Sequence, residues 1–219
     1  SEDFLAFFDP SKLQSEAWKH ALIISIFDGF GISYNRDAMQ QLAYKILEQS
    51  TPKKPLSIAK VFDMAFGENS NISWNYKGCR PNNHPKKRIE TALNFSILIQ
   101  QTPFSDFISL NALTLWKEWC SNSSISYSGH TKILYGTVFL PALYLLSNLY
   151  ASEKLRTLVL AEWKQFKAPI PKILLKKFNS LEIPSSIYKN KLGSIHQLNN
   201  YCHPKRCSNC NVLKKAILS

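Results

Sequence analysis

The residues best suited to chemistry lie near the C-terminal end of the chain, in the stretch YCHPKRCSNCNV at residues 201–212. Cys202, Cys207 and Cys210 form a C-x4-C-x2-C pattern, and Lys205 and Arg206 lie between the first two cysteines. A C-x2-C pair lets two thiolates reach one metal ion within a tight turn, and clustered cysteines are also typical of iron–sulfur proteins. The pattern therefore predicts a zinc site or an iron–sulfur cluster, with the two cations offsetting its negative charge.

The cysteine cluster has three close thiols and needs a fourth ligand from elsewhere in the fold. His203 directly follows Cys202, so the two cannot easily bind one metal ion together. The sequence offers four more distant candidates: Cys79, His84, Cys120 and His196. Two other interpretations stay open, an inert knuckle of packed thiols and a redox-active disulfide.

A second chemical signal lies in the stretch NISWNYKGCRPNNHPKKRIETAL at residues 71–93. Pro85 is well placed to begin a helix, because its missing N–H is not needed there. The next three residues, 86–88, are all cationic, although the first turn of a helix prefers negative charge. A bound phosphate would resolve this conflict.

The predicted phosphate site gathers the cations of this stretch and two aromatic residues that could stack on a base or a ribose. The alternative interpretation is a solvated basic turn, in which the arginines pair with carboxylates and the tryptophan packs in the core. The complete set of candidate nucleic-acid residues is Lys77, Arg80, Lys86, Lys87, Arg88, Trp74 and Tyr76, with Lys205 and Arg206 of the cysteine cluster as further cations.

Catalytic signatures are absent from the sequence. It contains no P-loop, nucleophile elbow, HExxH motif or dinucleotide-binding fingerprint. The acidic residues are scattered, with no spacing that would pair two carboxylates on one helix face. His130 follows Gly129 and is expected to satisfy a helix start rather than to act as a base. We therefore assign no catalytic residue.

Helical periodicity dominates the segments that must position these residues. The sequence predicts an all-α fold, an irregular bundle of roughly eight to ten helices with a C-terminal cysteine knuckle at 201–213. We expect one helical domain over 1–219, or two lobes at 1–67 and 86–219 joined by the polar loop 68–85. Expected helices cover 14–27, closed by Asp28-Gly29, then 36–50 with Asn35 as N-cap, 55–66 starting at Pro55, 85–101, 112–120, 129–150 with a kink at Pro141, 151–166, 171–183 and 184–202.

The composition is that of a globular protein, and its basic charge is explained either by a polyanionic partner or by a solvated lysine-rich surface. The chain has 219 residues, of which 45% are hydrophobic, and its 27 Lys and Arg exceed its 15 Asp and Glu, giving a net charge of +12. This excess favours nucleic acid over a membrane surface as the partner. Without an evident signal peptide or an unbroken apolar run, a cytoplasmic protein with no membrane contact is expected.

The ordered stretches together resemble the C-terminal part of an uncharacterised bacterial family, domain of unknown function two-eight-five-one. CRPNNHPKKRI is similar to its Arg-Pro-x-Asn-x-Pro-x-x-Arg motif at Arg80, Pro81, Asn83, Pro85 and Arg88. FDGFGISYNRDAMQQLAYKI, VFDMAFG and QLNNYCHPKRCSNCNVLKKAIL resemble its other stretches, although Cys79 stands where the family usually has an apolar residue. The resemblance implies that longer members carry an N-terminal, nuclease-like part that lies outside this sequence.

The cysteine cluster also resembles, more locally, the C-x6-C-x2-C-x5-C loop of endonuclease III-type DNA glycosylases. Here the first gap is shorter and the fourth cysteine is absent. Three functions follow as expectations. The first is a non-catalytic nucleic-acid-binding domain, the partner half of a nuclease-like protein. The second is a protein-interaction or scaffold domain, and the third is a degenerate glycosylase-like enzyme.

Overall fold

A computed structural model describes residues 2–9, 11–12, 14–31, 34–51, 53–81, 84–122, 125–127 and 129–167, with positions 176, 193, 201 and 206–209. The chain divides into two compact units, Ser1–Ala161 and Glu162–Ser219. The 68–85 loop and the helices on both sides of it fall in the first unit. Whether the chain folds as one domain stays a prediction. The helices expected at 171–183 and 184–202 lie outside the described residues.

The all-α prediction is confirmed, since the described residues form helices and no strand beyond one isolated bridge between Thr51 and Lys54. The helices are α1 (Glu2–Ala6), α2 (Gln14–Phe30), α3 (Arg36–Gln49), α4 (Ile58–Phe66), α5 (Pro85–Gln101), α6 (Phe104–Phe107), α7 (Ala112–Asn122), α8 (Gly129–Leu134), the π-helical turn η2 (Tyr135–Phe139), α9 (Leu140–Leu149), α10 (Glu153–Gln165) and the 3₁₀ turn η4 (Cys207–Asn209).

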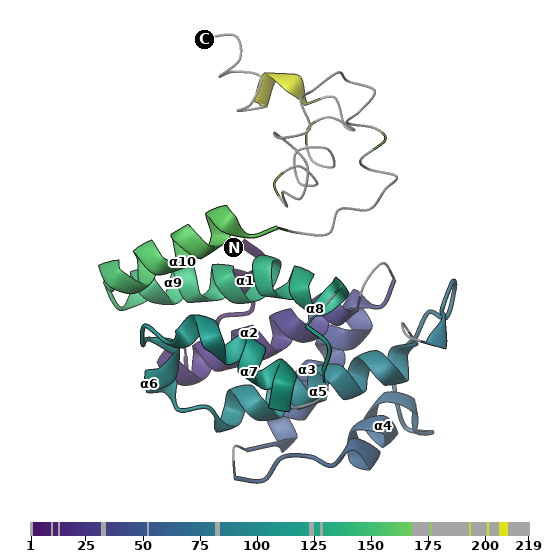
Figure 1. Cartoon of the computed structure of the whole chain (residues 1–219). Helices are drawn as coiled ribbons and strands as arrows, with labels where there is room; N and C mark the ends of the chain where they lie inside the picture. Colours follow the sequence, from purple (N-terminus) through teal and green to yellow (C-terminus); the bar gives the residue numbers. More distant parts are fainter. Residues whose placement is uncertain are drawn as a thin grey trace. The chain divides into compact units, whose positions relative to one another are not determined.

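Helix α2 is the centre of the first unit. It packs against α1, α3, α5 and η2, and lies inside the bundle in Figure 1. A helix that is apolar on all sides must be buried, and the run ALIISIF at 21–27 is buried throughout. The indole N–H of Trp18 donates a hydrogen bond to the carbonyl of Ala142 over 3.1 Å, which joins α2 to α9.

The predicted end of this helix at Asp28-Gly29 is wrong, because α2 continues to Phe30. Both residues are held by partners from other helices. The carboxylate of Asp28 accepts hydrogen bonds from Arg36 and Gln40 of α3, the latter over 2.6 Å. A Cβ at Gly29 would meet the side chain of Leu134, so the glycine allows α8 to approach closely.

Two other predicted helix starts also differ from the structure. Helix α4 begins at Ile58 rather than Pro55, because the hydroxyl of Ser57 caps it by accepting the N–H of Lys60 over 3.3 Å. Asn35 precedes α3 but makes no side-chain cap, since its amide bonds a distant loop. The start of α5 at Pro85 is confirmed, with the ring of His84 accepting the N–H of Lys86.

A π-helical turn, Tyr135–Phe139, lies directly before α9, which contains Pro141 near its start. The kink at Pro141 stays a prediction. The continuous helix Gly129–Leu149 is long and apolar enough to span a membrane by length and composition, yet 56% of its most apolar window is buried within the protein. The absence of membrane contact and the cytoplasmic location stay predictions.

Candidate nucleic-acid interface

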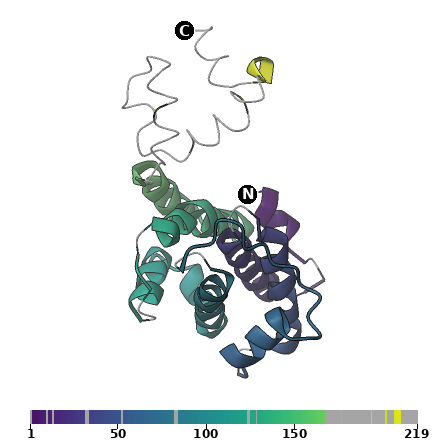
Figure 2. The same ribbon diagram turned by 90° about the vertical axis from the view of Figure 1, so that its right-hand side faces the viewer.

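The loop between α4 and α5 crosses the outside of the bundle, as Figure 2 shows for residues 67–81, and it is tied to the turn between α2 and α3. The amide of Asn35 donates to the carbonyl of Asn75 over 2.8 Å and accepts the N–H of Asn75 over 2.7 Å. The side chain of Asn75 in turn accepts the N–H of Lys77 over 2.8 Å. These bonds hold two segments forty residues apart in one arrangement.

A cavity of about 330 Å³, which we call the Arg88 pocket, lies where this loop meets α2, α3 and α5. Among the described residues that line it there is no Asp or Glu. Three of the predicted nucleic-acid residues lie in it, together with Cys79, the candidate metal ligand. The described lining residues are Phe30, Gly31, Tyr34, Asn35, Met39, Trp74, Asn75, Lys77, Gly78, Cys79, Pro85 and Arg88.

Arg88 is the half-buried cation of this pocket. Its guanidinium carbon lies 5.8 Å from the centre of the Phe30 ring, and within the described part of the chain no carboxylate pairs with it. Burial lowers the pKa of Arg88 below its usual value, because the charged form loses hydration. For Arg88, the pairing with a carboxylate that the alternative interpretation expects is not found among the described residues.

A second, more open cavity of about 630 Å³ lies between the end of this loop, α4 and the start of α5, and we call it the open cavity. Arg80, Lys86 and Lys87 line it, and Cys79 lines both cavities. The ammonium of Lys87 lies 2.8 Å from the carboxylate of Glu90, which also lines this cavity. The predicted cations are thus brought together in two neighbouring groups rather than in one.

The two predicted aromatic residues have different surroundings. The indole N–H of Trp74 donates to the carbonyl of Ala65 over 2.8 Å, and its ring contacts Phe66 at 5.3 Å between centroids, so it stabilises the loop. Tyr76 is 49% exposed and its ring lies 5.6 Å from that of His84. A stacking role for either residue stays a prediction.

Sequence reasoning missed Tyr34, which lines the Arg88 pocket and is 64% exposed. An exposed aromatic side chain directly after the turn GFGIS was the available signal for it. Phe30 and Asn35 were also missed as parts of this site. Their partners, Arg88 and Asn75, are distant in sequence, and no local pattern connects them.

His130, expected at a helix start, lies in the first turn of α8 and contacts Phe30, one of the residues that line the Arg88 pocket. Its Nε2 lies 2.9 Å from the carbonyl oxygen of Gly29, and its ring lies 5.2 Å from that of Phe30. Burial, followed by the nearby charge of Arg88, lowers the pKa of His130 to about 4, so the ring is neutral at pH 7 and donates to Gly29. This makes His130 a structural support.

The low pKa of His130 predicts a loss of stability in mild acid. In the unfolded chain His130 takes up a proton near pH 6.5, but in the folded chain only near pH 4. The contribution of neutral His130 to the free energy of unfolding is therefore fully present above pH 6.5 and is lost as the pH falls from 6.5 to 4. We expect His130 to contribute about 2 kcal/mol to this loss. Urea unfolding at pH 7.5 and 4.5 should show a smaller pH effect in His130→Gln. An unchanged pH effect would contradict the assignment.

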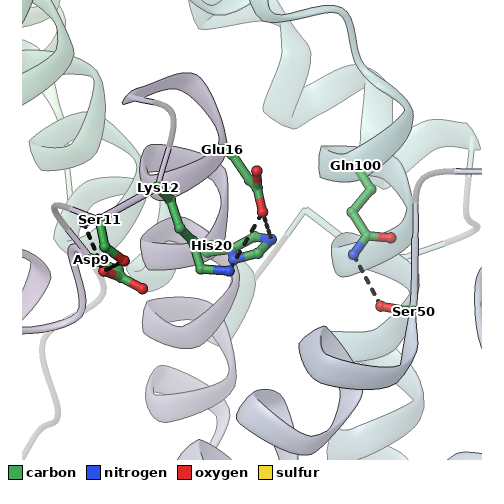
Figure 3. A network of polar contacts seen from close by, with 7 residues as sticks. All are labelled: Asp9, Ser11, Lys12, Glu16, His20, Ser50 and Gln100. Atoms are coloured by element: carbon green, nitrogen blue, oxygen red, sulfur yellow. Dashed lines mark hydrogen bonds and ion pairs between the residues drawn. The ribbon is translucent and has the colours of Figure 1, made fainter.

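A third cavity of about 390 Å³ lies beside the N-terminal half of α2. In the polar network of Figure 3, the carboxylate of Glu16 lies 3.5 Å from Lys12 Nζ and 3.8 Å from His20 Nε2. The ammonium of Lys19 donates to the carbonyl of Thr102 over 2.6 Å and helps to close the end of α5. In contrast to the described lining of the Arg88 pocket, this lining holds a carboxylate, Glu16, beside its cations.

The predicted metal site falls largely outside the described residues, because Cys202, Cys210 and Lys205 are among those not described. Cys207 and Arg206 are exposed, with Cys207 in the turn η4. Burial raises the pKa of Cys120 to about 11, which opposes the thiolate form that a metal requires. No group of three potential metal ligands occurs in the part of the chain that can be described. Zinc or an iron–sulfur cluster stays a prediction, as does Cys79 as a ligand.

Comparisons of this chain with protein-family models, with curated proteins and with solved structures found no match. The resemblances to domain of unknown function two-eight-five-one and to the glycosylase cysteine loop therefore stay predictions.

Proposed function

We propose that this chain is a non-catalytic helical domain that binds nucleic acid through the loop between α4 and α5 and the start of α5. The observation that carries the proposal is the open cavity, where Arg80, Lys86 and Lys87 lie together at the surface and outnumber Glu90, the one carboxylate among the described lining residues. Cations grouped in this way match a sugar–phosphate backbone. The net charge of +12 supports the same class of partner.

The family resemblance alone supports the part of the proposal that concerns a nuclease-like partner half. In that arrangement this domain would position the substrate, while another part of a longer protein supplied the catalytic groups. Binding would be mainly electrostatic and independent of sequence. Its affinity should therefore fall steeply with salt.

The proposal predicts how charge removal changes this salt dependence. Arg80→Ala combined with Lys86→Ala should weaken binding to a single-stranded oligonucleotide and lower the slope of log K against log salt by about 1.4, because each phosphate contact on a single strand contributes about 0.7. Fluorescence anisotropy at several salt concentrations measures both effects. The matched control is Lys53→Ala combined with Lys154→Ala, two exposed cations without an ion pair among the described contacts.

Two results would contradict the proposal. One is no detectable binding at low salt. The other is an identical salt slope in the Arg80–Lys86 variant and the wild type. An equal loss in the control pair would show that net charge, rather than the open cavity, determines binding, and would also count against the assigned surface.

A protein-interaction domain is the second candidate, and one observation favours it. An apolar cavity of about 230 Å³ between α1 and α9 is lined by Phe4, Leu5, Phe8, Leu145, Asn148 and Leu149. Leu5 and Leu149 are 55% and 46% exposed. The degenerate glycosylase has less support, because the Arg88 pocket lacks the carboxylate that such an enzyme would need.

A further inference from the structure

We propose that the Arg88 pocket holds the terminal phosphate monoester of a bound nucleic-acid strand. This inference rests on the proposed function, since the rest of the strand would lie along the open cavity. It assigns different roles to the two groups of cations. Those of the open cavity contact internal phosphates, and those of the Arg88 pocket recognise an end.

The first argument is the charge of Arg88. A half-buried cation without a counterion is costly, and such cations in proteins are normally paired. No carboxylate occurs among the described lining residues, and the nearby neutral ring of His130 donates its N–H to the carbonyl of Gly29. An anion that enters the pocket would supply the missing counterion and could accept two parallel hydrogen bonds from the guanidinium.

The second argument is the amount of charge in the pocket. Lys77 is the other cation in the lining, and no ion pair of its ammonium occurs among the described contacts. With Arg88 it provides two positive charges. A phosphate monoester carries about 1.5 to 2 negative charges at neutral pH, whereas an internal phosphodiester carries about one. The pair of cations therefore matches a terminal phosphate better than an internal one.

The third argument is shape. An internal phosphodiester has a sugar on both sides, so it reaches cations that lie on a surface, as those of the open cavity do. A terminal phosphate has a sugar on one side only and can enter a recess. The volume of about 330 Å³ is in the range of small-ligand pockets and could admit a phosphate with part of its sugar.

The surroundings of the pocket also suit a strand end. Cys79 lines both cavities, so a strand along the open cavity would reach the Arg88 pocket directly. Tyr34, 64% exposed in the pocket lining, could stack on the terminal base. The two hydrogen bonds between Asn35 and Asn75 hold the loop in place before any ligand binds, which lowers the entropic cost of binding.

The test compares oligonucleotides of one sequence that differ only at their ends: 5′-phosphorylated, 3′-phosphorylated and with hydroxyls at both ends. Fluorescence anisotropy at constant salt should show about tenfold tighter binding for one phosphorylated form, the gain expected from a charge-assisted hydrogen-bonded pair. Arg88→Gln should remove this preference. Lys87→Gln is the comparison, because Lys87 lies in the open cavity: it should weaken the binding of all three oligonucleotides alike and leave the preference for the phosphorylated end unchanged.

The outcomes separate this inference from the proposed function. Equal binding of all three oligonucleotides would overturn the terminal phosphate site and leave nucleic-acid binding intact. No binding of any oligonucleotide would overturn the proposed function itself. A free nucleoside monophosphate that binds as tightly as the phosphorylated strand would overturn the strand end as the source of the phosphate.

Stability measurements keep the variants interpretable. Arg88→Gln removes a half-buried charge that has no ion pair among the described residues, so it should unfold at the same denaturant concentration as the wild type or at a higher one. If it is destabilised, Arg88→Lys provides the second test. A lysine keeps the charge but cannot make the two parallel bonds, so most of the preference for a phosphorylated end should be lost. A full preference in Arg88→Lys would overturn the inference.

Discussion

Trp116→Ala is expected to lower the free energy of unfolding by about 3–5 kcal/mol, a large part of the stability of a domain of this size. Trp116 is completely buried, and its ring stacks on Phe95 at 4.6 Å and contacts Phe139 at 5.2 Å. These contacts join α7 to α5 and to η2. Truncation would leave a cavity that rigid helices cannot close.

Phenylalanine at the same position should be tolerated much better, and this comparison tests the cause. The indole N–H of Trp116 is buried without a hydrogen-bond partner among the described residues, and such a group costs about 1–3 kcal/mol. Trp116→Phe removes that cost together with part of the packing. The control is Trp18→Phe, where the lost N–H donates to Ala142.

Urea unfolding of the three variants measures the prediction. We expect Trp116→Ala to be the least stable, and Trp18→Phe to be less stable than Trp116→Phe by about 1 kcal/mol, the net value of one hydrogen bond. Equal stability of Trp116→Ala and Trp116→Phe would contradict a packing role for the ring. A larger loss in Trp116→Phe than in Trp18→Phe would show that the Trp116 N–H does find a partner.

The parts of the fold that were predictable from sequence depend on local physics. The start of α5 follows from Pro85, whose fixed φ and missing N–H suit the first helical position. The apolar periodicity of residues 36–50 and 112–120 likewise predicted α3 and α7, because it too is a local property of the sequence. The end of α2 was not predictable, because Asp28 would end an isolated helix. Here Arg36 and Gln40 on the next helix neutralise and bind its carboxylate.

The candidate site shows the same division between local and distant effects. The cations at 80–88 are adjacent in sequence, so their gathering around the start of one helix could be expected from the sequence alone. Their separation into two cavities could not. It results from the bonds between Asn35 and Asn75 and from the contact of Arg88 with Phe30, which join segments 40 and 58 residues apart.

Gly31→Ala is expected to lower the free energy of unfolding by about 3 kcal/mol, because no side chain fits at this position. An added Cβ would lie 2.6 Å from the carbonyl oxygen of Asn35 and 2.6 Å from the Cα of Arg36. Both are backbone atoms, so the whole turn between α2 and α3 would have to move. The ion pair between Arg36 and Asp28 would move with it.

Gly78→Ala is the matched control for this prediction. Gly78 has a φ of +70°, and a Cβ there would meet nothing within 4 Å. Gly78→Ala should therefore lower the free energy of unfolding through backbone strain alone, by about 1 kcal/mol. Equal stability of the two variants in urea would show that the turn can relax around a Cβ. If the turn cannot relax, Gly31→Ala should also break the hydrogen bonds between Asn35 and Asn75. The shape of the Arg88 pocket depends on these bonds, so oligonucleotide binding should weaken as well.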